Sequence, residues 1–185
     1  MERSLRTTLI DALALLGGRG IKAAVIGGLA VSLRGQPRMT VDVDLVVLAD
    51  VEQALALVCE LESTPFLPLF EGVEEVVSRS FILPLRHRST GVRVDLAIGM
   101  SGFERQAVER ATAVDLGGTA VPVVTPVDLL VMKAIAGRPR DEDDMRSIIA
   151  TQGEALDWNA CLELGRHLGE AIDIDIVSRL QAARR

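Results

Sequence analysis

Residues 22–48, KAAVIGGLAVSLRGQPRMTVDVDLVVL, consist of two apolar runs separated by glycine and proline. The first run, residues 22–26, is short and apolar after Lys22, which favours a buried strand. Residues 29–34 (LAVSLR) follow as a short helix that the next glycine and proline end. Residues 41–48 begin with strict alternation of valine and aspartate, and this period of two predicts a second strand.

The junction between the first strand and the helix carries Gly27 and Gly28. Bare backbone N–H groups at a helix start can bind an anion, and a glycine lets phosphate oxygens approach the backbone closely. An ordinary tight turn explains the same pair, so the glycines alone leave both interpretations open.

Asp42 and Asp44 project from one face of the second strand, because alternate residues share a face. Two neighbouring carboxylates repel unless a cation lies between them, and their hard oxygen atoms suit Mg²⁺. A solvated strand face is the simpler explanation. Against it stands Asp95, a third acid within the apolar run 92–99 (VRVDLAIG). If that strand lies beside the first, the three carboxylates converge.

The rest of the chain completes an α/β (α+β) fold with a small mixed sheet flanked by helices. Hairpins are expected over residues 79–99 and 113–124, and a mobile loop over residues 63–78. Residues 125–185 read as helices throughout. We therefore expect a core over residues 1–124 and a helical carboxyl-terminal part, residues 125–185, packed on it.

Composition excludes several classes of protein. The 185 residues suffice for one domain, and 49% are hydrophobic, which excludes wholesale disorder. A net charge of -6 opposes a broad nucleic-acid surface, and the absence of tyrosine opposes base-stacking platforms. No apolar run reaches the length of a membrane span, and no signal peptide is expected. The two cysteines, Cys59 and Cys161, are expected to be buried thiols in a cytoplasmic protein.

Lys133 is one of only two lysines in a chain with 18 arginines. It interrupts residues 129–136 (LLVMKAIA), which are otherwise apolar on every side and predict a buried helix. A buried ammonium is costly unless it is paired or bound to an anion, and a compact charge suits a triphosphate. The alternative is a lysine that extends to solvent at the edge of the helix. Asp141 and Asp144 share a face of the next helix, where Asp141 serves equally well as a cap and Asp144 is expected to be free.

These motifs resemble a known family. Ile26-Gly27-Gly28, a spacer and Asp42-Val43-Asp44-Leu45, with Asp95 as a third carboxylate, resemble the signature of the polymerase-β-like minimal nucleotidyltransferase superfamily. Residues 125–149 (TPVDLLVMKAIAGRPRDEDDMRSII) are similar to the carboxyl-terminal signature of its AbiEii-type toxin members.

The resemblance implies an enzyme that uses Mg²⁺ or Mn²⁺ to move a nucleoside monophosphate from a nucleoside triphosphate to an acceptor hydroxyl, releasing pyrophosphate. The implied metal ligands are Asp42, Asp44 and Asp95. The implied catalytic residues are Asp42, Asp44, Asp95, Lys133 and Asp144. The implied nucleotide-binding residues are Gly27, Gly28, Arg38, Lys133 and Asp141.

The acceptor remains open between RNA, a small molecule such as an aminoglycoside-like drug, and a protein. If the protein is the toxin of a toxin–antitoxin pair, a cognate antitoxin is expected as a partner. A non-catalytic relative that keeps the fold as a binding or partner module is the alternative. The intact acids argue against that alternative, because a degenerate copy would be expected to have lost one.

Overall fold

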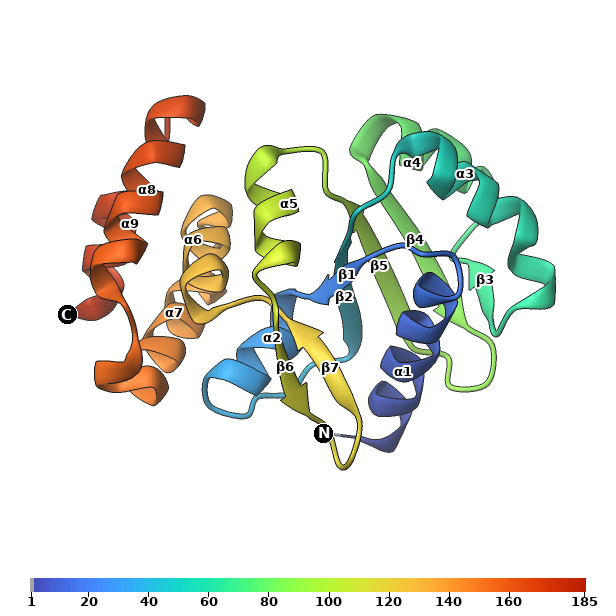
Figure 1. Cartoon of the computed structure of the whole chain (residues 1–185), viewed down its shortest axis with the longest axis horizontal. Helices are drawn as coiled ribbons and strands as arrows, with labels where there is room; N and C mark the ends of the chain where they lie inside the picture. The colour runs from blue at the N-terminus through green and yellow to red at the C-terminus, as the bar shows by residue number, and fades with distance from the viewer. Residues whose placement is uncertain (1) are drawn as a thin grey trace. The chain divides into compact units, whose positions relative to one another are not determined.

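The computed structural model describes residues 2–185, which form two compact units (Figure 1). Unit 1 comprises the described residues up to Leu29 together with Met39–Val123. Unit 2 comprises Ala30–Arg38 together with Val124–Arg185. All the strands belong to unit 1, whereas unit 2 is helical.

Unit 1 is built on a seven-stranded mixed sheet with the order β3-β4-β5-β2-β1-β7-β6. β2 pairs in parallel with β5, and β1 pairs in parallel with β7, whereas the other neighbours are antiparallel. The strands are β1 (Ala23–Val25), β2 (Asp42–Val47), β3 (Phe66–Pro68), β4 (Ile82–His87), β5 (Arg93–Ile98), β6 (Thr112–Asp115) and β7 (Ala120–Val123). The predicted fold class, a mixed sheet flanked by helices, is confirmed.

Helices pack against this sheet. The helices are α1 (Arg3–Gly17), α3 (Val51–Glu60), α4 (Val73–Ser80) and α5 (Gly102–Glu109), with a 3-10 turn, η1, at Leu61–Ser63. α2 (Gly27–Arg34) begins in unit 1 and continues into unit 2. Leu16 of α1 and Leu57 of α3 meet Val47, Leu96 and Ile98 in the core under the central strands. α5 contacts β1 and β2.

The alternation of β2 and β5 divides their residues between the core and the opposite face. Val43, Leu45, Val94 and Leu96 are almost completely buried. The residues between them, including the three aspartates, are only partly buried or exposed. One face of the central strand pair is therefore apolar and packed, and the other carries the charged side chains.

The expected loop over residues 63–78 is wrong. This segment contains the end of η1, strand β3 and most of helix α4. Phe66 of β3 is fully buried and its ring meets the edge of the His87 ring, with the centroids 5.1 Å apart. Val73 and Val77, one turn apart on α4, are also buried. These elements are short, so tertiary contacts stabilise them more than their own sequence periodicity does.

The two cysteines are free thiols, but only one of them is buried. Cys161 is fully buried, and this burial raises the pKa of its thiol to about 11. Cys59 is exposed, which corrects the expectation of two buried thiols. It lies on the face of α3 opposite the buried Ala54 and Leu57.

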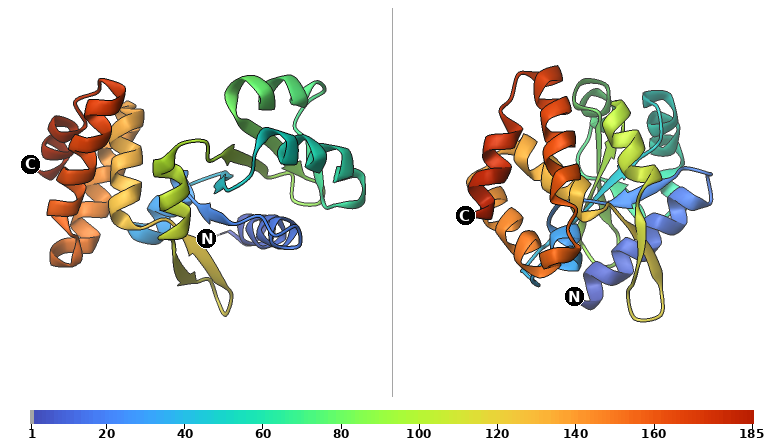
Figure 2. Two further views of the ribbon diagram at one scale, coloured as in Figure 1. Left: turned by 45° about the horizontal axis from the view of Figure 1, so that its top comes forward. Right: turned by 60° about the vertical axis from the view of Figure 1, so that its left-hand side comes forward.

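Unit 2 is a cluster of helices that pack against one another (Figure 2). Its helices are α6 (Pro126–Ala136), α7 (Pro139–Gln152), α8 (Trp158–Ile172) and α9 (Ile176–Arg184), with a 3-10 turn, η2, at Gly153–Ala155. α7 begins at Pro139, two residues before the expected start at Asp141. The Gln36 N–H donates to Ser147 Oγ at 2.7 Å, which ties the segment before β2 to α7. None of the helices within residues 2–185 is long and apolar enough to cross a membrane.

The packed face of β2 leads to a stability prediction. Leu45→Ala should lower the free energy of unfolding by about 3 kcal/mol, because it opens a cavity at a site with no solvent exposure. Val41→Ala, at a side chain that is 74% exposed, is the matched control and should stay within about 0.5 kcal/mol of wild type. Urea unfolding followed by circular dichroism measures both. Equal losses in the two variants would contradict the burial of Leu45 in the core.

Candidate functional site

The three acids of unit 1 lie on one face of two adjacent parallel strands. Asp44 of β2 is the direct register partner of Asp95 of β5, and Asp42 is the partner of Arg93. The strand that carries Asp95 thus lies beside the strand that carries Asp42 and Asp44. This is the condition that the sequence analysis set for the three acids to lie close together. Neighbouring strands are about 4.8 Å apart, so the Asp44 and Asp95 backbones are close neighbours.

Arg93 lies among these acids and forms two parallel contacts with one of them. Its Nε donates to Asp95 Oδ1 at 2.8 Å, and its second guanidinium nitrogen lies 2.8 Å from Asp95 Oδ2. The hydrogen bond to Asp95 raises the pKa of Arg93, partial burial opposes this, and the charges of Asp95, Asp42 and Asp44 raise it further. All three carboxylates are therefore within electrostatic reach of one guanidinium.

The acids do not form a ready-made metal centre. Within residues 2–185, no three His, Cys, Asp or Glu side chains are grouped so that they could hold a metal ion. Both Asp95 oxygens contact Arg93, and Asp42 Oδ1 accepts a hydrogen bond from Thr40 Oγ1 at 3.1 Å. The expected convergence of three carboxylates is therefore incomplete, because Asp42 and Asp95 are turned toward Thr40 and Arg93 and like charges repel.

Gly27 packs directly against Asp44. Its φ of 63° lies in the left-handed region that favours glycine. A Cβ atom added at residue 27 would lie 1.9 Å from Asp44 Oδ2, and the Ile26 N–H donates to the Asp44 carbonyl oxygen at 3.0 Å. The space beside the Asp44 carboxylate thus depends on the missing side chain. Gly28 follows in the first turn of α2.

In unit 2, Lys133 joins two acids of the next helix. α6 positions it: the Thr125 side chain caps this helix by accepting from the Asp128 N–H, and Gly137 is the cap at its carboxyl end. The Lys133 side chain is only 12% exposed. Its Nζ lies 2.8 Å from Asp141 Oδ1 and 2.8 Å from Asp144 Oδ2. The buried ammonium is therefore paired with two carboxylates rather than extended into solvent.

Arg38 completes this cluster, which we call the unit 2 network: Arg38, Lys133, Asp141 and Asp144. Arg38 Nε lies 2.8 Å from Asp144 Oδ1, and Arg38 also donates to Asp144 Oδ2 at 3.2 Å. The expectation that Asp144 is free is therefore wrong, since both of its oxygens are bound and its side chain is 4% exposed. Asp141 Oδ2 accepts from the Arg138 N–H at 3.0 Å, which caps α7 from the third helical position.

The structure thus groups the sequence-predicted residues in two sets. Gly27, Gly28, Asp42, Asp44 and Asp95 belong to unit 1, and the four members of the unit 2 network belong to unit 2. Arg93 is the residue whose place at the acids the sequence analysis missed. The sequence contained the information needed to find it. Arg93 lies two residues before Asp95, and alternate residues of a strand share a face.

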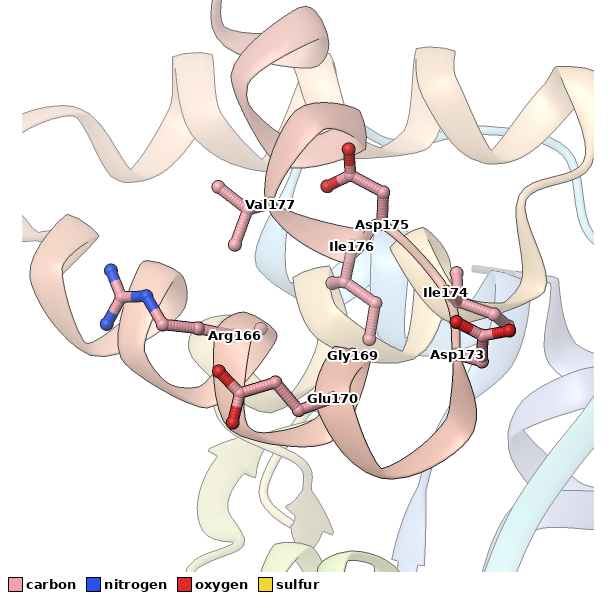
Figure 3. Close-up of a pocket in the computed structure, with 9 residues that line it drawn as sticks. Arg166, Gly169, Glu170, Asp173, Ile174, Asp175, Ile176 and Val177 are labelled. Atoms are coloured by element: carbon pink, nitrogen blue, oxygen red, sulfur yellow. The ribbon is translucent and has the colours of Figure 1, made fainter.

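A separate hollow of about 470 Å³ lies in unit 2 where α8 turns into α9 (Figure 3). Acidic side chains and Arg166 surround it, as the close-up shows. Its lining residues are Gly165, Arg166, Gly169, Glu170, Asp173, Ile174, Asp175, Ile176 and Val177. It contains none of the residues predicted from the sequence, and Asp175 within it is already used to cap α9 through the Ser178 N–H.

Solved structures with the same fold are nucleotidyltransferases or resemble them. An antigenic nucleotidyltransferase-like protein from Paracoccidioides brasiliensis is 22% identical, with a TM-score of 0.56 over 97% of this chain and 93% of that one. ANT(2")-Ia in complex with adenylyl-2"-tobramycin is 15% identical, with a TM-score of 0.56 over 97% and 98% of the two chains. The lincomycin-bound lincosamide antibiotic adenylyltransferase LnuA is 12% identical, with a TM-score of 0.54 over 78% and 96%. At these sequence identities the comparison shows a shared fold and nothing further.

Comparison by sequence gives the family. No curated protein matches the chain. A family described as a nucleotidyltransferase of unknown function, DUF6036, matches residues 7–167, which include both strands with the acids and the whole unit 2 network. The match spans most of the chain, and the fold agrees with it. The chain therefore belongs to the DUF6036 family of nucleotidyltransferases.

Proposed function

We propose that this protein is a metal-dependent nucleotidyltransferase that transfers a nucleoside monophosphate from a nucleoside triphosphate to an acceptor hydroxyl. The observation that carries the proposal is the register of β2 and β5, which sets Asp44 beside Asp95 on the partly exposed face of the sheet. Family membership supports the reaction class, and the position of Gly27 against Asp44 supports a site that must stay uncrowded.

The donor set of unit 1 suits a divalent cation. Asp42, Asp44 and Asp95 offer only carboxylate oxygens, which Mg²⁺ and Mn²⁺ prefer over nitrogen or sulfur. These three side chains would hold the metal after the contact between Arg93 and Asp95 opens. A bound metal would neutralise phosphate charge and make the acceptor hydroxyl more acidic.

The protein's own groups would carry out the remaining steps. Gly27 and Gly28 would let the triphosphate approach the backbone N–H groups at the start of α2. Asp95 would orient the acceptor hydroxyl and take its proton while the acceptor oxygen bonds to the α-phosphorus and pyrophosphate leaves. Lys133 and Arg38 would bind phosphate oxygens, with Asp141 and Asp144 holding the ammonium of Lys133 in place.

RNA, a small hydroxylated molecule and a protein are the candidate acceptors, and two of the similar solved structures are antibiotic adenylyltransferases. Membership of the AbiEii-type toxins, a cognate antitoxin and a cytoplasmic location rest on the sequence alone. Incubating the protein with each labelled nucleoside triphosphate and, in turn, total RNA, small hydroxylated compounds and protein tests the reaction and its acceptor together. Absence of Mg²⁺-dependent nucleotide binding would favour the non-catalytic binding module.

Asp44→Asn should lower transfer at least about 100-fold, equivalent to about 2.7 kcal/mol, because it removes one metal-binding charge. It should also weaken the binding of Mn²⁺ to the nucleotide-free protein. Asp143→Asn, at a side chain that is 81% exposed, is the matched control and should leave both quantities unchanged. Label transfer and Mn²⁺ titration measure the two effects. Transfer by Asp44→Asn at the wild-type rate would refute the mechanism.

Gly27→Ala separates backbone strain from crowding of Asp44. Gly91→Ala is the control, because Gly91 also has a positive φ, 72°, but nothing lies within 4 Å of its missing Cβ. Each variant should lose about 1 kcal/mol of stability through left-handed backbone strain. Only Gly27→Ala should also lose Mn²⁺ binding and transfer, since its methyl group displaces the Asp44 carboxylate. Loss of transfer in both variants, or in neither, would count against the proposed role of Gly27.

Lys133→Met should lower the free energy of unfolding by about 3 kcal/mol, because it leaves Asp141 and Asp144 buried with less compensating charge. Lys22→Met, at the exposed second lysine, should stay within about 0.5 kcal/mol of wild type. Lys133→Arg should regain much of the stability but not full transfer, because a planar guanidinium cannot reproduce the compact ammonium. Urea unfolding and label transfer distinguish the two properties. A fully stable Lys133→Met would mean that the network contributes little to folding.

A further inference from the structure

The contact between Arg93 and Asp95 joins a cation of this chain to the carboxylate that faces Asp44. The guanidinium contacts both oxygens of Asp95 at 2.8 Å, which is the two-pronged geometry of strong arginine–carboxylate pairs. Asp42 is the direct register partner of Arg93 on the other strand, yet Arg93 makes its hydrogen bond along its own strand to Asp95. The proposed metal ligand and the arginine are therefore already bound to each other.

The neighbours of Arg93 explain why its side chain lies over Asp95. Its cross-strand partner on β4 is Arg86, a second arginine, and like charges directly opposite each other repel. Asp95 on the same strand, and Asp42 and Asp44 on β2 at the other side, attract it. Arg93 is thus repelled by Arg86 of β4 and attracted by the aspartates of β2 and of its own strand.

A divalent cation cannot share Asp95 with Arg93 in this arrangement without severe charge repulsion. Both oxygens are in contact with the guanidinium, so a metal ion bound there would place two positive groups side by side. The Arg93 side chain is 50% exposed, whereas that of Asp95 is 20% exposed. Arg93 can therefore move into solvent at little cost, while Asp95 stays at the site.

We propose that Arg93 is a built-in counter-ion that holds Asp95 in the metal-free protein and that competes directly with the divalent metal for this carboxylate. The inference rests on the proposed metal-dependent function. Metal binding then includes the displacement of Arg93, which lowers the apparent metal affinity and keeps the acids from repelling one another when no metal is bound. Arg93 acts through Asp95, so it is a positioning residue.

The test measures Mn²⁺ binding to the nucleotide-free protein by calorimetry. Arg93→Gln should bind Mn²⁺ about tenfold more tightly than wild type, because the competitor is gone. Arg86→Gln removes an equal charge from the neighbouring strand without touching Asp95, so it should change the affinity by less than about twofold. Equal tightening in the two variants would overturn the proposal, since it would reveal general electrostatics. Unchanged or weaker binding in Arg93→Gln would also overturn it.

Melting temperatures provide a second readout that does not depend on transfer. In chelator, Arg93→Gln should melt below wild type, because it loses an ion pair and leaves the acids uncompensated. With Mn²⁺ added, its melting temperature should rise by more than that of wild type. A purely structural role for Arg93 would give the first effect without the second.

Different results would refute the competition by Arg93 and the metal site itself. Mn²⁺ binding that needs Asp44 but does not respond to the loss of Arg93 would refute the competition and leave the proposed function standing. No Mn²⁺ binding by wild type or by Arg93→Gln would refute the metal site and, with it, the competition.

Discussion

The parallel pairing of β2 with β5 is the constraint on which the candidate site depends. Its register fixes Asp44 opposite Asp95 and Asp42 opposite Arg93. The same pairing buries Val43, Leu45, Val94 and Leu96 on the opposite face. A shift of one residue would exchange the two faces, so the hydrophobic core holds the register that brings the acids together. The geometry of the site is thus maintained by side chains that take no part in its chemistry.

The negative charges of the site residues are balanced in two ways, one by an arginine and the other by a lysine. Arg93 uses its planar fork on the single carboxylate of Asp95, at a partly exposed position. Lys133 has three donors on a compact ammonium, and it serves two carboxylates that lie three residues apart on α7. An exposed pair can open at little cost, whereas breaking a nearly buried pair leaves an uncompensated charge. The first arrangement is therefore suited to exchange, and the second to a fixed structure.

Gly27 shows how closely the backbone and the acids are fitted to each other. The left-handed φ and the missing Cβ meet at one residue, which begins α2 and contacts the Asp44 carboxylate. Any other residue here would be strained by the positive φ and would crowd Asp44, so both the backbone and its neighbour require glycine. The sequence predicted the importance of this glycine for phosphate, but its observed contact is with an aspartate.

The sequence by itself determined the elements whose periodicity is strong and the face on which each residue lies. The alternation in residues 41–48 placed Asp42 and Asp44 on one side of a strand, and the pattern from residue 125 onward predicted the helices of which α6 is the first. Periodicity cannot predict which strands are neighbours, nor which charged side chains form ion pairs. Both depend on contacts between residues that are distant in sequence. Only the tertiary structure therefore decided that Arg93 holds Asp95, that Arg38 and Lys133 bind Asp144, and that residues 63–78 are ordered by burying Phe66 and two valines.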